Sequence, residues 1–264
     1  MVSQLISRCW SWVGEQASSK LQDALLAIIS AGPVPRHVAF VMDGNRRYAR
    51  SKKKMVKEGH SDGFLALKRV LAICFRLNVK CVSTYGFAID NFKRSPEEVE
   101  ALMDLIEEKL LEICQHGDLL EQYGVRLNIV GNTALFPERV RVAARKAEDI
   151  SRHNDKSILN LCMPYASSDE MATAVQSAVN KGLAAEDDIT VEDIDSQLMT
   201  TLGRSPPLDL LIRTSGVKRL SDFLLWQCCE NTQLQFSPTY WPDFGLWDIV
   251  PMLLDYQRKA WASA

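Results

Sequence analysis

The sequence has no feature that would place it across a membrane, in an oxidising compartment or around a zinc ion. None of its apolar runs approaches the roughly 20 residues that a membrane-spanning helix needs. Its seven cysteines form no C-x-x-C pair, and its four histidines do not fall at the spacing of zinc ligands. The first residues show neither a cleavable signal pattern nor the arginine- and serine-rich composition of a transit peptide. These absences favour buried free thiols in a reducing compartment.

The motifs of several common enzyme classes are also missing. There is no G-x-x-x-x-G-K-[ST] loop for nucleotide phosphates, no G-x-G-x-x-G after a strand, and no G-x-S-x-G nucleophile turn. With 31 basic and 33 acidic residues, the formal net charge is −2. This balance argues against a general nucleic-acid binder, so no nucleic-acid partner is expected, and local clusters of charge carry more information than the total.

Short β-rich runs alternate with helical patterns along the chain, without repeats or linkers. Strands are expected at 37–42, 79–88, 125–131, 157–165, 208–213 and 233–237, and helices near 60–77, 97–122, 137–152, 168–181 and 191–201. Strands that are apolar on both faces and separated by helices indicate a parallel sheet covered on both sides. We therefore predict one α/β domain over 33–264, with a mainly parallel central sheet of about six strands covered by helices, preceded by an amphipathic helical segment at 1–32.

The helix expected at 97–122 has the clearest pattern. Ser95, Pro96 and Glu98 form a helix-start signal, with a cap, a first-turn proline and a glutamate three residues after the cap. The apolar residues then recur at three- and four-residue spacing, which gives the helix one apolar face. They are Val99, Leu102, Met103, Ile106, Leu110, Ile113 and Cys114. From the pattern alone, core packing is the favoured role for Leu102, Met103, Ile106 and Leu110, and the wall of an apolar tunnel is the alternative.

Three polar clusters follow expected strands, at 43–47, 90–94 and 213–221. The carboxyl ends of parallel strands lie at one edge of a sheet, where ligands bind in such folds. That edge would bring the carboxylate of Asp43 among five arginines, namely Arg46, Arg47, Arg94, Arg213 and Arg219. Arginine clamps phosphoryl oxygens in bidentate fashion and a hard cation takes carboxylate oxygen, so the clusters predict diphosphate groups held together with Mg²⁺. Without a nucleotide motif or a nucleophile, diphosphate itself is expected to be the leaving group.

The same clusters resemble the signature blocks of cis-prenyltransferases. The blocks are HVAFVMDGNRRYA at 37–49, YGFAIDNFKR at 85–94, LIRTSGVKRLSDFLLWQ at 211–227 and WPDF at 241–244. The Asp-rich D-D-x-x-D pattern of trans-type synthases is absent. The blocks look most similar to the catalytic subunit of eukaryotic dehydrodolichyl diphosphate synthases, with the plant rubber-type enzymes as close relatives. The resemblance implies an undecaprenyl-diphosphate-synthase-like fold.

The resemblance also implies an activity and a role for each matching residue. The reaction would be repeated cis condensation of isopentenyl diphosphate onto an allylic primer such as farnesyl diphosphate, with Mg²⁺ bound by Asp43. Gly44, Arg46, Arg47 and Arg94 match positions that hold the allylic diphosphate. Asn45, Asn91 and His60 match positions near the reacting groups, and Arg213, Arg219 and Ser221 match the isopentenyl diphosphate site.

The chain departs from the family pattern at three places. Val217 stands where a glutamate is common, and Thr232 stands where bacterial homodimeric members have a metal-binding glutamate. The sequence ends QRKAWASA, without the C-terminal R-x-G that reaches the isopentenyl diphosphate site in the family. These departures favour a heteromer in which a Nogo-B-receptor-like subunit supplies the R-x-G. Truncation at the C-terminus is the alternative for the last departure, but it does not explain Thr232.

Other expectations concern location and competing functions. The early segment containing Trp10, Trp12, Val13, Leu21, Leu25, Ile28 and Ile29 is either a helix packed on the domain or a membrane-surface helix. The resemblance implies peripheral association with the cytosolic side of the endoplasmic reticulum membrane. The aromatic segment 236–247 is assigned by a small margin to an interface rather than the core. Competing functions are a rubber-type or shorter-chain cis-prenyl synthase, a non-catalytic scaffold subunit and a diphosphate hydrolase.

Overall fold

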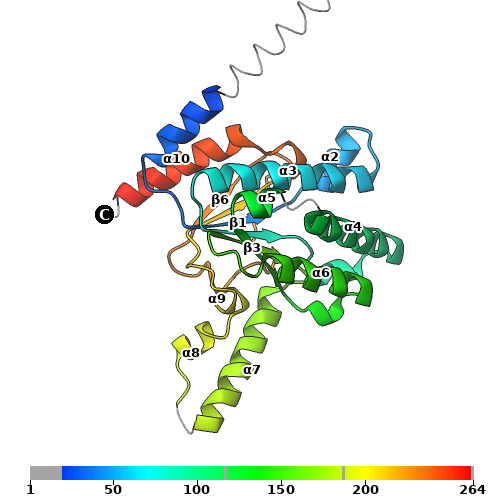
Figure 1. Cartoon of the computed structure of the whole chain (residues 1–264), viewed down its shortest axis with the longest axis vertical. Coiled ribbons are helices and arrows are strands. Elements are labelled where there is room, and N and C mark those ends of the chain that lie inside the picture. The colour runs from blue at the N-terminus through cyan, green and yellow to red at the C-terminus, as the bar shows by residue number, and fades with distance from the viewer. Residues whose placement is uncertain (1–19, 116–117, 186–187, 263–264) are drawn as a thin grey trace, which may run out of the picture.

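The six expected strands are present and form one parallel sheet. The computed structural model describes residues 20–115, 118–185 and 188–262 (Figure 1). The strand order is β3-β4-β2-β1-β5-β6, and every neighbouring pair is parallel. The strands are β1 (His37–Val41), β2 (Cys81–Tyr85), β3 (Val125–Val130), β4 (Ser157–Cys162), β5 (Leu210–Arg213) and β6 (Gln233–Phe236).

The register of the central strands places the three polar clusters together. Strand β1 lies between β2 and β5, and Phe40 of β1 is opposite Thr84 of β2 and Ile212 of β5. All three strands therefore end side by side, and the segments that follow them open onto one edge of the sheet. This arrangement confirms the expectation that a parallel sheet brings these clusters to a common edge.

The two faces of the sheet are covered differently. Val38 and Phe40 of β1 point into a large apolar core, whereas Ala39 and Val41 belong to a smaller one on the opposite face. The large core is completed by apolar residues of α3 (Val56–Arg76), α4 (Pro96–Gln115), α6 (Glu138–Ser151) and α10 (Leu246–Ala262). The smaller core is closed mainly by the segment that follows β5, and α7 (Ser167–Ala185) extends away from the body on that side (Figure 1).

The helix predictions were right in most places and wrong in others. The predicted segment 97–122 contains α4 and α5 (Asp118–Gln122), but 191–201 forms two short helices, α8 (Val191–Asp195) and α9 (Met199–Leu202), instead of one. Helix α2 (Asn45–Ser51) and α10 were missed. Short 3₁₀ turns, η1 (Ile89–Lys93), η2 (Thr133–Leu135) and η3 (Trp241–Asp243), complete the described elements.

The interface assignment for the aromatic segment was wrong for its two central rings. Trp241 and Phe244 are fully buried and stack on each other with their ring centroids 5.8 Å apart. The ring centroid of Phe40, on the central strand β1, lies 5.8 Å from that of Trp241, so the aromatic segment closes the large core. Among the aromatic residues of this segment, only Trp247 is exposed, at 65%. The need to cover the apolar face of β1 accounts for this burial.

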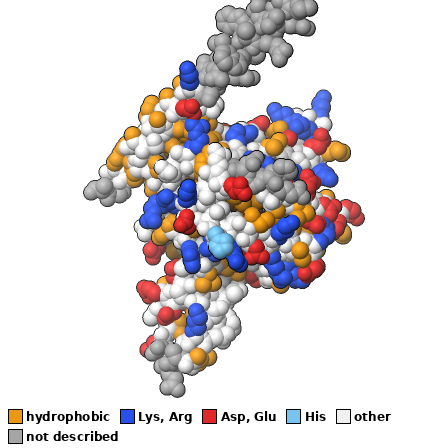
Figure 2. All heavy atoms as spheres, in the orientation of Figure 1, with side chains coloured by type: hydrophobic (Ala, Val, Ile, Leu, Met, Phe, Trp, Pro, Cys, Tyr) orange, Lys and Arg blue, Asp and Glu red, His pale blue; other side chains and the backbone are white. Residues whose placement is uncertain are grey.

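The early segment is helical at 20–30, and this part packs on the domain. Leu26 and Ile29 are buried in the large core, and Gln257 of α10 donates a 2.7 Å hydrogen bond to the carbonyl oxygen of Ile29. Leu21 and Ile28 are exposed, as are Leu254 and Trp261 of α10. Figure 2 shows hydrophobic side chains gathered over this end of the molecule. Trp10, Trp12 and Val13 lie outside the described residues. The domain boundary at residue 32 stays a prediction.

Candidate active site

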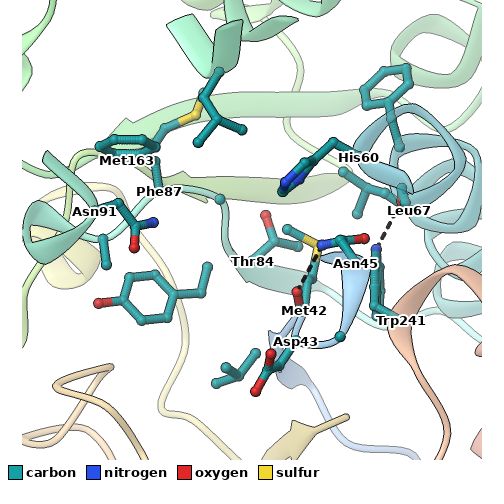
Figure 3. A pocket seen from close by; sticks show the side chains of 18 of the residues that line it. Met42, Asp43, Asn45, His60, Leu67, Thr84, Phe87, Asn91, Met163 and Trp241 are labelled. Carbon is teal, nitrogen blue, oxygen red and sulfur yellow. Dashed lines mark hydrogen bonds between the residues drawn. The ribbon is translucent and has the colours of Figure 1, made fainter. Parts of the chain in front are cut away.

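A cavity of about 580 Å³ opens at the carboxyl edge of the sheet. Figure 3 shows Asp43, Asn45 and His60 reaching toward it from the end of β1, from α2 and from α3, with Phe87 and Met163 along another wall. Every residue that the sequence singled out lies on its wall: Asp43, Gly44, Asn45, Arg46, Arg47, His60, Asn91, Arg94, Arg213, Arg219 and Ser221. The structure thus brings together all of the candidate residues, while their individual roles stay predictions.

Asp43 is the anionic centre of the cavity mouth. Arg213 donates a 2.9 Å hydrogen bond from Nη2 to Oδ2 of Asp43, and Nη2 of Arg47 lies 3.3 Å from Oδ1. Burial alone would raise the pKa of Asp43, but hydrogen bonds from Arg213 and Ser215 and the charges of Arg213 and Arg47 hold it below the ordinary carboxyl value. Asp43 is therefore ionised at neutral pH and half-buried, which suits a ligand for a hard cation.

The Arg213 side chain anchors the segment that follows β5. It is only 4% exposed, and its Nη1 donates to the carbonyl oxygen of Arg219 at 2.6 Å and to Oγ of Ser221 at 2.7 Å. Nε of Arg219 also donates to Ser221 Oγ, at 3.2 Å. Two guanidinium groups thus converge on one hydroxyl at the cavity wall. A buried arginine with this surplus of donors is a ready clamp for phosphoryl oxygens.

The arginines on the other side of the mouth share a carboxylate that the sequence reasoning missed. Glu98, in the first turn of α4, accepts a 2.9 Å hydrogen bond from Arg94 and lies 3.6 Å from Arg46. Arg94 also donates to Oδ1 of Asn91 at 3.0 Å. The i,i+4 spacing of Arg94 and Glu98 was the available signal, but Glu98 had been used to explain the helix start. The predicted cap itself is confirmed, because Ser95 Oγ accepts from Glu98 N–H at 3.3 Å.

Among the described residues, three that line the cavity each have a buried polar atom without a hydrogen-bond partner. The atoms are Oδ1 of Asn45, Nε2 of His60 and Nε of Arg213. Burial, together with the smaller effect of the Arg94 charge, lowers the pKa of His60 to about 4, so the imidazole is neutral at pH 7. Close packing of α2 on α3 fixes Asn45, since a Cβ on Gly63 would lie 2.3 Å from its Oδ1. Unsatisfied buried groups of this kind are expected where a ligand completes the hydrogen bonding.

The inner part of the cavity is apolar. Leu102, Ile106, Leu110 and Ile113 of α4 line it together with Leu67 of α3. The favoured core role is confirmed for Met103 and Leu110, which are buried in the large core, although Leu110 also lines the cavity. Leu102 and Ile106 are partly buried against the core and line the cavity, which is the alternative role. Helix α4 and the end of strand β2 both contribute residues to the cavity wall. A cationic mouth that leads into an apolar interior fits a molecule with a diphosphate head and a hydrocarbon tail.

Several residues in or beside the cavity were given no role of their own from the sequence. Tyr85 at the end of β2, Arg50 in α2 and Lys109 in α4 line the cavity. Ser215, which has a positive φ of 76°, accepts a 2.6 Å hydrogen bond from Arg47. Thr232 is engaged elsewhere, because its hydroxyl oxygen lies 2.7 Å from the carbonyl oxygen of Leu208. A neutral hydroxyl in this place cannot replace an anionic metal ligand.

Comparison with known proteins agrees with this geometry. Residues 41–262 match the family described as "Putative undecaprenyl diphosphate synthase". A dehydrodolichyl diphosphate synthase complex subunit from Schizosaccharomyces pombe is 50% identical over 243 residues, which cover 91% of each chain. The chain belongs to the cis-prenyltransferase family. A human dehydrodolichyl diphosphate synthase complex subunit is 39% identical to this cis-prenyltransferase, over 94% of its chain and 75% of the human one.

Solved structures of prenyl diphosphate synthases have the same fold as this cis-prenyltransferase. A lavandulyl diphosphate synthase from Lavandula x intermedia, in complex with dimethylallyl diphosphate, is 31% identical and superposes with a TM-score of 0.79 over 85% of this chain and 95% of that one. A probable undecaprenyl diphosphate synthase from Campylobacter jejuni is 26% identical with a TM-score of 0.69 and the same coverage. The expected fold class is confirmed, and this cis-prenyltransferase is an enzyme of the polyprenyl diphosphate synthase kind.

Proposed function

We propose that this enzyme is the catalytic subunit of a dehydrodolichyl-type synthase, which lengthens farnesyl diphosphate with isopentenyl diphosphate. The observation that carries the proposal is that a cationic mouth around Asp43 and an apolar interior belong to one cavity. The naming of relatives as subunits of a dehydrodolichyl diphosphate synthase complex supports it. A scaffold subunit would not need to retain the arginines and Asp43 at one site, so that reading is the weaker one.

In the proposed reaction, the allylic C–O bond breaks, the isopentenyl double bond forms a new C–C bond, and one proton leaves. Arg46, Arg47 and Arg94 would hold the allylic diphosphate, and Arg213 and Arg219 the isopentenyl diphosphate. Their guanidinium groups stabilise negative charge as the diphosphate departs. The apolar interior receives the lengthening chain and excludes water, which favours transfer over hydrolysis.

The site also fits Mg²⁺. No group of three or more His, Cys, Asp or Glu side chains gathers into a metal cage within the described residues. Mg²⁺ rarely needs one, since it keeps several waters and binds through one or two carboxylates and the oxygens of substrate phosphates. Asp43, ionised and open to the cavity, would be the residue that holds it. When bound, Mg²⁺ would neutralise charge on the leaving diphosphate.

We further propose a Nogo-B-receptor-like partner subunit and a peripheral location on the cytosolic side of the endoplasmic reticulum membrane. The neutral Thr232 supports the partner, as does the naming of relatives as subunits of a complex. The exposed apolar side chains of Leu21, Ile28, Trp247 and Trp261 support contact with a lipid surface. In the described part of the chain, no helix is both long and apolar enough to cross a bilayer.

The test is elongation by the purified chain, with and without the partner subunit. The reaction contains farnesyl diphosphate, labelled isopentenyl diphosphate and Mg²⁺, and chromatography gives product length. Polyprenyl products only with the partner are the expected result. Strong elongation by the chain alone would contradict the need for a partner, and diphosphate release without chain growth would indicate a hydrolase.

Asp43→Ala tests the proposed Mg²⁺ ligand. We expect elongation to fall by at least about 100-fold, because the variant loses a charge-bearing group at the reacting diphosphate. Partner binding should be unchanged. Asp255→Ala is the matched control, since this α10 carboxylate pairs only with neighbouring cations on its own helix among the contacts described. Retained activity in Asp43→Ala would contradict the proposal that Asp43 binds Mg²⁺.

A further inference from the structure

The segment 221–224, which carries a wall residue of the cavity, has an unusual backbone. Ser221, Asp222 and Leu224 have positive φ angles of 56°, 58° and 48°. Residues with a Cβ adopt this left-handed region rarely, and they stay there only where the surroundings hold them. Two such residues in succession therefore call for an identifiable restraint on this part of the chain.

The restraint on one side is the start of α7. Both carboxylate oxygens of Asp222 are engaged by Ser168, with Oδ1 accepting from its N–H at 2.9 Å and Oδ2 from its hydroxyl at 2.5 Å. The carbonyl oxygen of Asp222 accepts from the N–H of Ser167 at 2.8 Å. Leu225 N–H in turn donates to Oγ of Ser167 at 2.9 Å. Two consecutive serines thus fix the segment from both ends, and we call this set of contacts the Asp222 clamp.

The restraint on the other side comes from the end of β2. The hydroxyl of Tyr85 lies 3.2 Å from the carbonyl oxygens of both Ser221 and Tyr165, which share its proton. Its ring stacks on Phe223 with centroids 4.5 Å apart and an angle of 12°. Phe223 is fully buried. The clamp and the stacked rings therefore hold Ser221 between them. Its hydroxyl is left pointing at the guanidinium groups of Arg213 and Arg219.

We propose that Asp222 is a positioning residue for isopentenyl diphosphate, acting through Ser221 and Arg219. Asp222 does not line the cavity, so it has no direct contact with substrate to offer. Its effect is to hold the neighbouring hydroxyl and the carbonyl oxygen of Arg219 where Arg213 meets both. Within the described part of the chain, no hydrogen bond or ion pair joins Arg94 or Glu98 to the residues of the clamp. The inference rests on the proposed function, because it names the isopentenyl site of that reaction.

The test compares Asp222→Ala and Asp222→Asn in the active form of the enzyme, with its partner subunit if that is needed. Asp222→Ala loses both bonds to Ser168, and we expect the KM for isopentenyl diphosphate to rise about tenfold. The KM for farnesyl diphosphate should stay within about twofold. Asparagine keeps one acceptor oxygen, so Asp222→Asn should restore most of the affinity. A general structural role would move both KM values together or reduce only kcat.

Asp193→Ala provides the matched control. Asp193 accepts hydrogen bonds from the N–H and hydroxyl of Thr190 at 2.8 and 2.7 Å, which is the same kind of contact at the start of α8. Its loss should leave both KM values unchanged. If Asp222→Ala does not fold or assemble, Ser168→Ala is used to test the proposal instead. This variant removes only the 2.5 Å hydrogen bond from the Ser168 hydroxyl to Asp222, and it should raise the KM for isopentenyl diphosphate about two- to threefold.

The outcomes separate this inference from the proposed function. A wild-type enzyme that adds no isopentenyl unit under any condition overturns the proposed function, and the inference with it. An active wild type whose isopentenyl KM is unaltered by Asp222→Ala, or by Ser168→Ala when the first variant is lost, overturns the inference alone. A selective rise in the isopentenyl KM that asparagine reverses supports the Asp222 clamp.

Discussion

Ionisable residues at the two ends of β1 stand in opposite electrostatic surroundings. His37 begins the strand and is fully buried, with Nδ1 2.8 Å from the carbonyl oxygen of Pro206 and Nε2 2.8 Å from Oγ of Ser83. Because a carbonyl oxygen only accepts, Nδ1 carries the proton and Nε2 accepts from Ser83. Asp43, just beyond the other end, is surrounded by cations. At neutral pH the histidine at the start of the strand is therefore neutral, and the carboxylate just beyond its end is charged.

The neutrality of His37 makes stability depend on pH. Burial lowers the pKa of His37 to about 4, although the hydrogen bond to Pro206 opposes this. The unfolded chain therefore takes up the proton first, and the free energy of unfolding should fall as pH drops from about 6.5 toward 4. The loss from this group is at most about 3 kcal/mol. His60 adds to the same trend, since burial lowers its pKa to about 4 as well.

Urea denaturation at pH 7, 6 and 5 checks this expectation. His37→Gln should be less stable than the wild type at pH 7 but should lose less stability between pH 6.5 and 5. The exposed His153 supplies the control, His153→Gln, which should follow the wild-type curve. An unchanged pH dependence in His37→Gln would contradict the assignment of this trend to His37.

At the scale of elements, α4 carries the wall of the apolar interior. Ile106→Trp fills part of the cavity, so polyprenyl products should become shorter, with a loss of stability of about 1–3 kcal/mol from crowding. Leu65→Trp is the matched control, because Leu65 is 59% exposed on α3 and should not alter product length. Chromatography of the products and thermal unfolding of both variants provide the measurements. Products of unchanged length from a folded Ile106→Trp enzyme would mean that the chain grows elsewhere.

The sequence was informative where local pattern and sheet topology agree. The strands appear as apolar runs in the sequence. Because the carboxyl ends of parallel strands lie at one edge of a sheet, Asp43 and Arg213 could be placed at the same edge before any contact between them was known. The proximity of Glu98 to Arg46 was missed because it depends on how α4 packs beside α2. Helix α10 was missed because Pro251 lies inside it and its apolar residues are exposed on one face as well as buried on the other. Such facts belong to tertiary packing rather than to local pattern.

At the scale of the whole molecule, the helix at 20–30 is part of the body. Ile29→Ala should lower the free energy of unfolding by about 2–4 kcal/mol, because Ile29 is 1% exposed and packs in the large core. The adjacent Ile28 is 67% exposed, so Ile28→Ala should change the free energy of unfolding by no more than about 0.5 kcal/mol. Chemical denaturation of the two variants gives the comparison. Equal effects would mean that the helix does not dock through this face.

The strand order has a consequence for how a newly made chain gains its site. The first four strands in the sequence, within 37–162, form one contiguous part of the sheet, and β5 joins later along the open edge of β1. Asp43 meets Arg213 across 170 residues of chain, a separation that makes this one of the late contacts to form. Since synthesis exposes the N-terminal part first, a ribosome-bound chain can pair β1 with β2 long before it has a diphosphate site. During that interval the backbone groups along one edge of β1 are unpaired. When β5 pairs with this edge, the same folding step also assembles the diphosphate site.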